Sequence, residues 1–205
     1  LCERAGVINL GLDGTLVLSA MTGFAAACAT DSLLLGFLAG ALTGVLVALV
    51  LALATLTLRQ SQFAVGFVLT LLCRDLAYVL GTGFEHQMGP EVGRGPVPGL
   101  ADVPVVGPVF FSQNLVVYAS LASIVAAWYF LYYTQAGLRL RGLGENPRAA
   151  FARGVNVIRQ RYLYVVIGGA LVGLGGAAFS LCIKGWSRPD GISGTGWIAL
   201  AIVIF

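Results

Sequence analysis

The chain has 205 residues, of which 58% are hydrophobic and only 10% are charged, and its mean hydropathy is +0.90. Ordinary soluble domains carry about a quarter charged residues, so this composition excludes them and indicates a membrane protein. The net charge of +3 gathers in one segment. We therefore expect membrane lipid around the chain and no nucleic-acid partner.

A membrane-spanning helix needs roughly 20 mostly apolar residues. Runs of this kind predict an all-α fold, a polytopic transmembrane helical bundle in one domain over residues 1–205. The predicted complete spans lie near residues 5–28, 33–58, 63–83, 114–133 and 163–183, and a truncated sixth begins at about 195. The chain opens without methionine and stops inside an apolar run, so we expect a fragment, and we expect no removable signal peptide.

The link between the fourth and fifth spans, residues 134–162, carries the strongest charge bias in the chain. It holds six arginines against a single acidic residue, Glu145. Because basic residues concentrate in cytoplasmic loops, we expect this link in the cytoplasm. The alternation of spans then puts Arg4 and Arg59 inside and Asp31 outside.

The loop at residues 84–113 falls on the outer side in this scheme. It contains five prolines and several glycines, so it cannot be helical throughout. Two interpretations stay open, a cap over the outer mouth of the bundle and a solvated linker.

The beginning of the first span is unusually polar. Gly6, Gly11 and Gly14 interrupt the helix, and Asn9 and Asp13 lie among them. An interrupted span leaves backbone N–H and C=O groups without helical partners, and these groups must face protein or water. A carboxylate inside a membrane costs free energy as well. Such a pattern therefore often marks a translocation pathway.

We take Asn9 and Asp13, together with Thr70 in the third span, as candidates for lining a substrate pathway. The alternative is that the polar stretch is only the interfacial end of a span whose inner flank begins at Glu3 and Arg4.

The third span carries two charges, Arg74 and Asp75, where exposure to lipid would cost a few kcal/mol. We expect both to find partners inside the bundle, as an interhelix ion pair rather than as a pathway lining. Small residues at a spacing of four predict close helix packing on two faces. These faces are Gly36, Gly40 and Gly44, and Gly169, Gly173 and Ala177.

The basic segment 142–154 has its own helix signals. Asn146 followed by Pro147 is a good helix start and Gly154 a good stop, which predicts about two helical turns. So short a helix must dock on something, and Phe151 with nearby arginines suits a protein partner. The alternative is a solvated loop whose arginines only set orientation.

The motifs INLGLDG and GLRLRGLGENPRAA, with the apolar stretches that follow them, resemble the permease subunits of binding-protein-dependent ABC importers. The resemblance extends over nearly the whole chain and is greatest to the nucleoside and simple-sugar branch of the branched-chain amino acid and ribose group. It implies about eight to ten transmembrane helices in the complete protein.

The resemblance also implies partners. They are two cytoplasmic ATPase subunits, a second permease subunit that is a paralogue or another copy, and an extracytoplasmic substrate-binding protein. The segment that docks on the ATPase would be the coupling segment. Its expected contact residues are Gly144, Glu145, Asn146, Pro147, Arg148, Phe151 and Arg153.

We therefore expect a permease for nucleosides or simple sugars in the cytoplasmic membrane of a bacterium or archaeon. It would have no catalytic residue, metal or cofactor of its own, because ATP and Mg²⁺ would bind the partner ATPase and the chain has no P-loop motif. Alternatives are the same machinery carrying branched-chain amino acids, an ion-coupled transporter using Asp13, Arg74 and Asp75, and a membrane scaffold without transport.

Overall fold

The computed structural model describes residues 1–85, 87, 89–90, 92–93, 113–186 and 191–204. Five helical segments are long and apolar enough to cross a membrane, which confirms the predicted fold class and the number of complete spans. The helices of these segments are α1 (Leu12–Thr30), α2 (Leu33–Ala52) with the π-helical turn η2 (Leu53–Thr57), α3 (Gln62–Gly81) with η3 (Thr82–Phe84), α4 (Leu115–Tyr133), and α7 (Val157–Phe179) with η5 (Ser180–Lys184).

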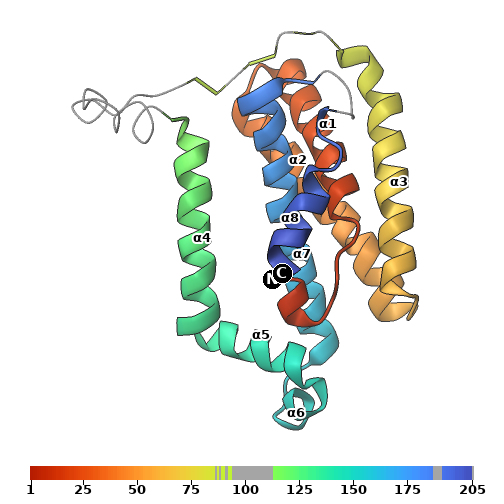
Figure 1. Cartoon of the computed structure of the whole chain (residues 1–205), viewed down its shortest axis with the longest axis vertical. Coiled ribbons are helices and arrows are strands. Elements are labelled where there is room, and N and C mark those ends of the chain that lie inside the picture. The colour runs from red at the N-terminus through yellow and green to blue at the C-terminus, as the bar shows by residue number, and fades with distance from the viewer. Residues whose placement is uncertain (86, 88, 91, 94–112, 187–190, 205) are drawn as a thin grey trace, which may run out of the picture.

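Four shorter elements complete the described chain. They are η1 (Glu3–Ala5), α5 (Gln135–Glu145), α6 (Pro147–Ala152) and α8 (Thr195–Ile204). Figure 1 shows α5 running across one end of the bundle with α6 below it, and the turn between α2 and α3 lies at this same end. We call it the α6 end.

The core of the bundle is formed by α1, α2 and α7, with α3 packed on the outer side of α1. Glycines let α2 and α7 approach closely, as the small-residue faces predicted. A Cβ atom on Gly44 would collide with the carbonyl oxygen of Gly169, and one on Gly173 would collide with that of Gly40. At such contacts the backbones themselves are the packing surface.

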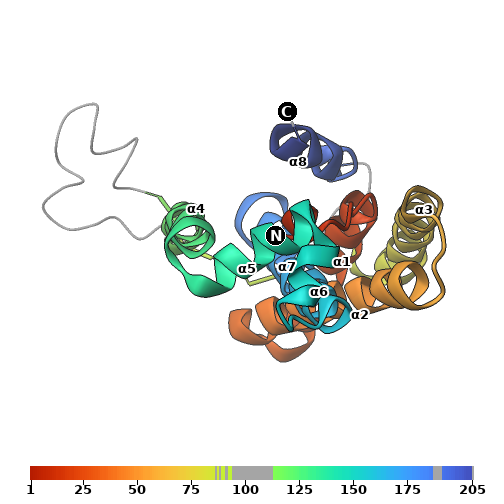
Figure 2. The same ribbon diagram turned by 90° about the horizontal axis from the view of Figure 1, so that it is seen from below.

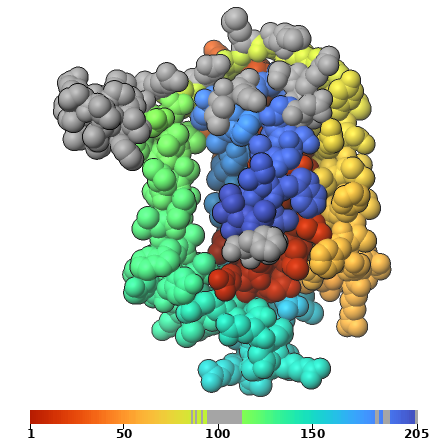
Figure 3. Space-filling model, in the orientation of Figure 1, coloured from red at the N-terminus to blue at the C-terminus, as the bar shows by residue number. Residues whose placement is uncertain are grey.

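By contrast, α4 stands apart from the bundle, and Figure 3 shows a gap between its atoms and those of α8. None of its residues is buried, and it packs mainly against α5. A cluster of aromatic rings marks its end near α5, where Trp128 lies 5.1 Å from Tyr133 between ring centroids. Aromatic side chains of this kind are typical of membrane–water interfaces.

Two predicted span boundaries are wrong. The first spanning helix begins at Leu12 rather than near residue 5, because residues 6–11 are not helical. The fifth begins at Val157 rather than near residue 163, because Asn156 caps it by accepting a hydrogen bond from the N–H of Arg159. Most of the loop at 84–113 lies outside the described residues.

Candidate functional site

The first span is broken between the α6 end and the middle of the bundle. The helical turn η1 ends at Gly6, whose φ of +76° is a left-handed conformation that glycine adopts without strain. The chain then runs outside any helix to Gly11, and α1 begins at Leu12. Inside a membrane, the backbone groups released by such a break must be hydrogen-bonded by other parts of the protein.

Side chains from α3 supply two of these bonds. The Gln62 side-chain oxygen accepts a hydrogen bond from the Ile8 N–H at 3.0 Å. The Thr70 hydroxyl lies 2.9 Å from the Leu10 carbonyl oxygen and 3.1 Å from that of Gly66, so its proton is committed to the backbone. The hydroxyl of Thr70, a predicted pathway residue, thus joins α3 to the break.

Asn9 lies inside the break and is 4% exposed. Its side-chain oxygen accepts a hydrogen bond from the Gly11 N–H at 3.1 Å. No described residue accepts a hydrogen bond from its amide nitrogen. Of the three predicted pathway residues, Asn9 is therefore the one with a donor still available.

Asp13 is also buried, at 4% exposed, and it binds a helix from the far end of the chain. One oxygen of its side chain accepts hydrogen bonds from the N–H groups of Gly194 and Gly196, both at 2.9 Å. These groups lie at the start of α8, where backbone donors have no partner within the helix. Asp13 therefore joins the first turn of α1 to the first turn of α8.

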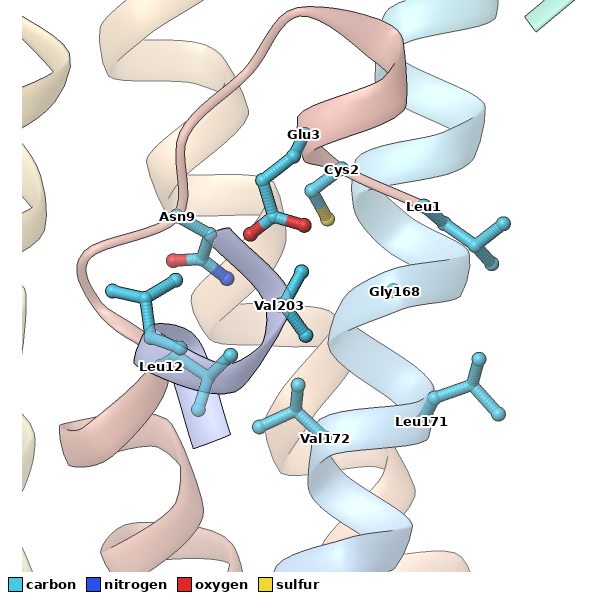
Figure 4. Close-up of a pocket in the computed structure, with 10 residues that line it drawn as sticks. Leu1, Cys2, Glu3, Asn9, Leu12, Gly168, Leu171, Val172 and Val203 are labelled. Atoms are coloured by element: carbon cyan, nitrogen blue, oxygen red, sulfur yellow. The ribbon is translucent and has the colours of Figure 1, made fainter. Parts of the chain in front are cut away.

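A pocket of about 210 Å³ lies against the break, between η1, the middle of α7 and α8. Glu3 and Asn9 contribute its carboxyl and amide groups. Figure 4 shows both groups on the same side of the pocket, turned toward the same space, with the Asn9 nitrogen directed toward Val203. The apolar part of the lining is formed by Leu1, Leu12, Leu171, Val172, Leu200 and Val203.

The coupling segment forms the predicted helix at the α6 end. The Asn146 side chain accepts a hydrogen bond from the Ala149 N–H at 3.1 Å, Pro147 is the first helical residue, and Gly154 follows the helix with a φ of +81°. Phe151 is 72% exposed, and Arg148 and Arg153 are exposed beside it. A short helix with an exposed aromatic ring between arginines suits a docking surface for another protein.

The coupling segment is connected directly to the broken span. Gly144, at the end of α5, packs so closely on η1 that a Cβ atom there would collide with the carbonyl oxygen of Arg4. On the other side, Arg161 of α7 donates a hydrogen bond from Nε to the carbonyl oxygen of Ala5 at 3.1 Å. Two elements that flank α6 in sequence therefore hold the residues just before the break.

The expectation for Arg74 and Asp75 is wrong in one respect. Both side chains are exposed on α3 instead of buried in the interior of the bundle, because the buried face of this helix is formed by Gly66, Leu69, Thr70, Cys73 and Ala77.

Two residues that hold the backbone at the break were not predicted from the sequence. Gln62 is the first residue of α3, and Arg161 was counted only among the charges that set orientation. Their partners are backbone groups of Ile8 and Ala5, which are far away in the sequence. The only available signal was indirect: a broken span requires donors and acceptors from neighbouring helices.

A helical bundle with several candidate membrane spans, one of them interrupted at a polar stretch inside the bundle, has the construction of a membrane transport protein. Comparison with known proteins supplies the family. Residues 1–205 match the family described as branched-chain amino acid transport system / permease component. The chain belongs to this permease family, as the resemblance implied, and is a multi-pass membrane protein.

Several relatives are similar over 99% of the chain. A putative glucose ABC transporter permease protein of Haloferax volcanii is 37% identical, and the chain covers 63% of its length. A nucleoside ABC transporter permease protein of Lactococcus lactis is 36% identical, with 68% covered. A guanosine ABC transporter permease protein of Bacillus subtilis is 34% identical, with 67% covered. The chain thus spans about two thirds of the length of these relatives, and no solved structure shows significant similarity to it.

Proposed function

We propose that the chain is the membrane-spanning permease subunit of an ABC importer for nucleosides or simple sugars. It resides in the cytoplasmic membrane of a bacterium or archaeon and is energised by separate ATPase subunits that bind ATP and Mg²⁺. The family match supports the assignment as an ABC importer permease, and the names of the glucose, nucleoside and guanosine relatives support the proposed substrates.

The observation that carries this proposal is the continuous connection from an exposed docking surface to the broken span. The exposed helix α6 follows α5, the Gly144 end of α5 packs on η1, and the break begins at Gly6. A protein that pushed on α6 would therefore move the segment that interrupts the pathway. Rigid-body rocking of this kind is how alternating access is achieved around a fixed mid-membrane site.

Each partner has a place in this scheme. The ATPase subunits dock on the coupling segment at the α6 end, which faces the cytoplasm. The substrate-binding protein docks at the opposite end, and a second permease subunit, a paralogue or another copy, completes the pair. The residues proposed to touch the ATPase are Gly144, Glu145, Asn146, Pro147, Arg148, Phe151 and Arg153.

The test is uptake by the complete importer, reconstituted in vesicles with its ATPase and binding protein. Replacing the exposed anchor and its neighbour, Phe151→Ser with Arg153→Asn, removes the contact that the ATPase needs. We expect ATP-driven uptake of guanosine or glucose to fall at least about tenfold, the effect of deleting an interface hot spot, while the complex still reaches the membrane.

The matched control is Arg59→Asn, which removes another exposed arginine at the same end of the bundle and suits its φ of +54°. This variant should transport normally. Unchanged coupling in the Phe151 and Arg153 variant would refute the docking role. Uptake that ignores ATP depletion but stops when an ion gradient is collapsed would select the ion-coupled alternative, and ATP-driven uptake of leucine alone would select the amino acid branch.

A further inference from the structure

The pocket beside the break has the composition of a site for a sugar ring. Its lining is largely apolar, and Glu3 and Asn9 contribute a carboxyl and an amide group to it. Gly168 and Val172 place it beside the middle of α7, and Glu3 places it on the inner side of the break. Ligand sites are typically apolar pockets with a few convergent polar groups, and transporters bind cargo near the midplane.

Glu3 is the more informative of the two polar groups. It is half-buried in η1, on the side of the pocket toward the α6 end, and no described residue donates a hydrogen bond or forms an ion pair with its carboxyl group. A half-buried carboxyl group that lines an otherwise apolar pocket is stabilised when a ligand or water donates hydrogen bonds to it. The structure thus has an acceptor, Glu3, and a donor, the Asn9 amide nitrogen, that face one space and have no partner among the described residues.

We propose that Glu3 and Asn9 recognise adjacent hydroxyl groups of the cargo's sugar ring as it passes the break. Each ring hydroxyl is both a donor and an acceptor, so one can donate to the Glu3 carboxyl while its neighbour accepts from the Asn9 nitrogen. The apolar walls then pack on the ring's carbon face. This inference rests on the proposed function and specifies its substrate class, because a sugar ring is the chemistry that glucose and nucleosides share.

The size of the pocket agrees with this assignment. Its volume of about 210 Å³ is smaller than the roughly 300–1,000 Å³ of sites for drug-sized ligands. It therefore suits one ring at a time, as expected of a position that cargo passes through rather than a site that stores it.

The experiment compares cargo with and without the hydroxyl groups, in the complete importer reconstituted in vesicles. Guanosine is compared with its 2′,3′-dideoxy analogue, which lacks the two adjacent hydroxyl groups on the ribose ring, and glucose with 2-deoxyglucose. Because the binding protein captures the cargo, KM reflects the affinity of that protein for the cargo. The maximal uptake rate per complex reflects how fast the cargo passes through the permease. For Glu3→Gln we expect this rate to fall about tenfold for guanosine or glucose, the effect of weakening a hydrogen bond to a charged group, with little change for the deoxy analogue.

Glu3→Asp, which keeps the carboxyl group on a shorter arm, should restore part of the hydroxyl-dependent rate. The matched control is Asp31→Asn, a carboxyl-to-amide change in the left-handed residue that ends α1 far from the pocket, which should leave both rates unchanged. An equal loss of rate for cargo and deoxy analogue in Glu3→Gln would overturn the sugar-ring assignment alone. If the wild-type importer shows no ATP-driven uptake of either cargo, the proposed function fails, and this inference fails with it.

Discussion

At the scale of single residues, the polar side chains in and around the first span serve mainly to satisfy backbone hydrogen-bonding groups that have no partner within a helix. Thr70 bonds the Leu10 carbonyl oxygen, and Asp13 caps α8. A polar residue in a membrane span can therefore be retained for backbone satisfaction, and only a group with spare capacity, as at Asn9, is available to a ligand.

Asp13 offers a direct test of this distinction. Asp13→Asn keeps a side-chain oxygen that both α8 donors can reach, so the free energy of unfolding in detergent should change by less than about 1 kcal/mol. Asp13→Ala should lower this free energy by about 1–3 kcal/mol, because the N–H groups of Gly194 and Gly196 lose their acceptor. Thermal unfolding of the purified protein measures both. Equal losses in the two variants would contradict the capping role, and loss of transport in the stable Asn variant would point to ion coupling instead.

At the scale of elements, features encoded by neighbouring residues could be predicted from the sequence, and contacts between residues far apart in the sequence could not. The α6 cap at Asn146 was predictable because all its parts lie within nine residues, 146–154. The glycine faces of α2 and α7 were predictable because helical periodicity alone reveals them. The bond from Asp13 to α8 was not predicted because its partners lie 181 and 183 residues later. The helix α5 was not predicted either, because its eleven residues include three glycines, which lower helix propensity, and lie in the charged link between two spans.

The close contact of α2 and α7 predicts a sharp difference between two glycines of the same helix. In Gly173→Ala the new methyl group would collide with the Gly40 carbonyl oxygen, so we expect a loss of about 1–3 kcal/mol from overpacking. Gly175 is exposed with open space around it, so Gly175→Ala should be neutral or stabilising by up to about 1 kcal/mol. Denaturant unfolding in detergent compares the two, and equal effects would show that α2 and α7 are not held in backbone contact.

At the scale of the whole molecule, the connections at the α6 end make one mechanical unit of three separate segments. The docking helix, the start of α7 and the residues before the break meet at η1, through Gly144 on one side and Arg161 on the other. Under the proposed function, motion of the ATPase reaches the pocket through η1, because only residues 6–8 separate Ala5 from Asn9 and the Ile8 N–H in this segment is hydrogen-bonded to Gln62.

Arg161 tests this route without altering the docking surface. Arg161→Leu removes the hydrogen bond to the Ala5 carbonyl oxygen, so η1 is released from α7 and uptake per ATP hydrolysed should fall about tenfold, the effect of losing a hydrogen bond to a charged group. Arg159→Leu is the control, because this exposed arginine points about 200° away around the same helix. A role limited to stability would instead lower the amount of assembled importer and leave the ratio of uptake to hydrolysis unchanged, since every complex that still forms would couple normally.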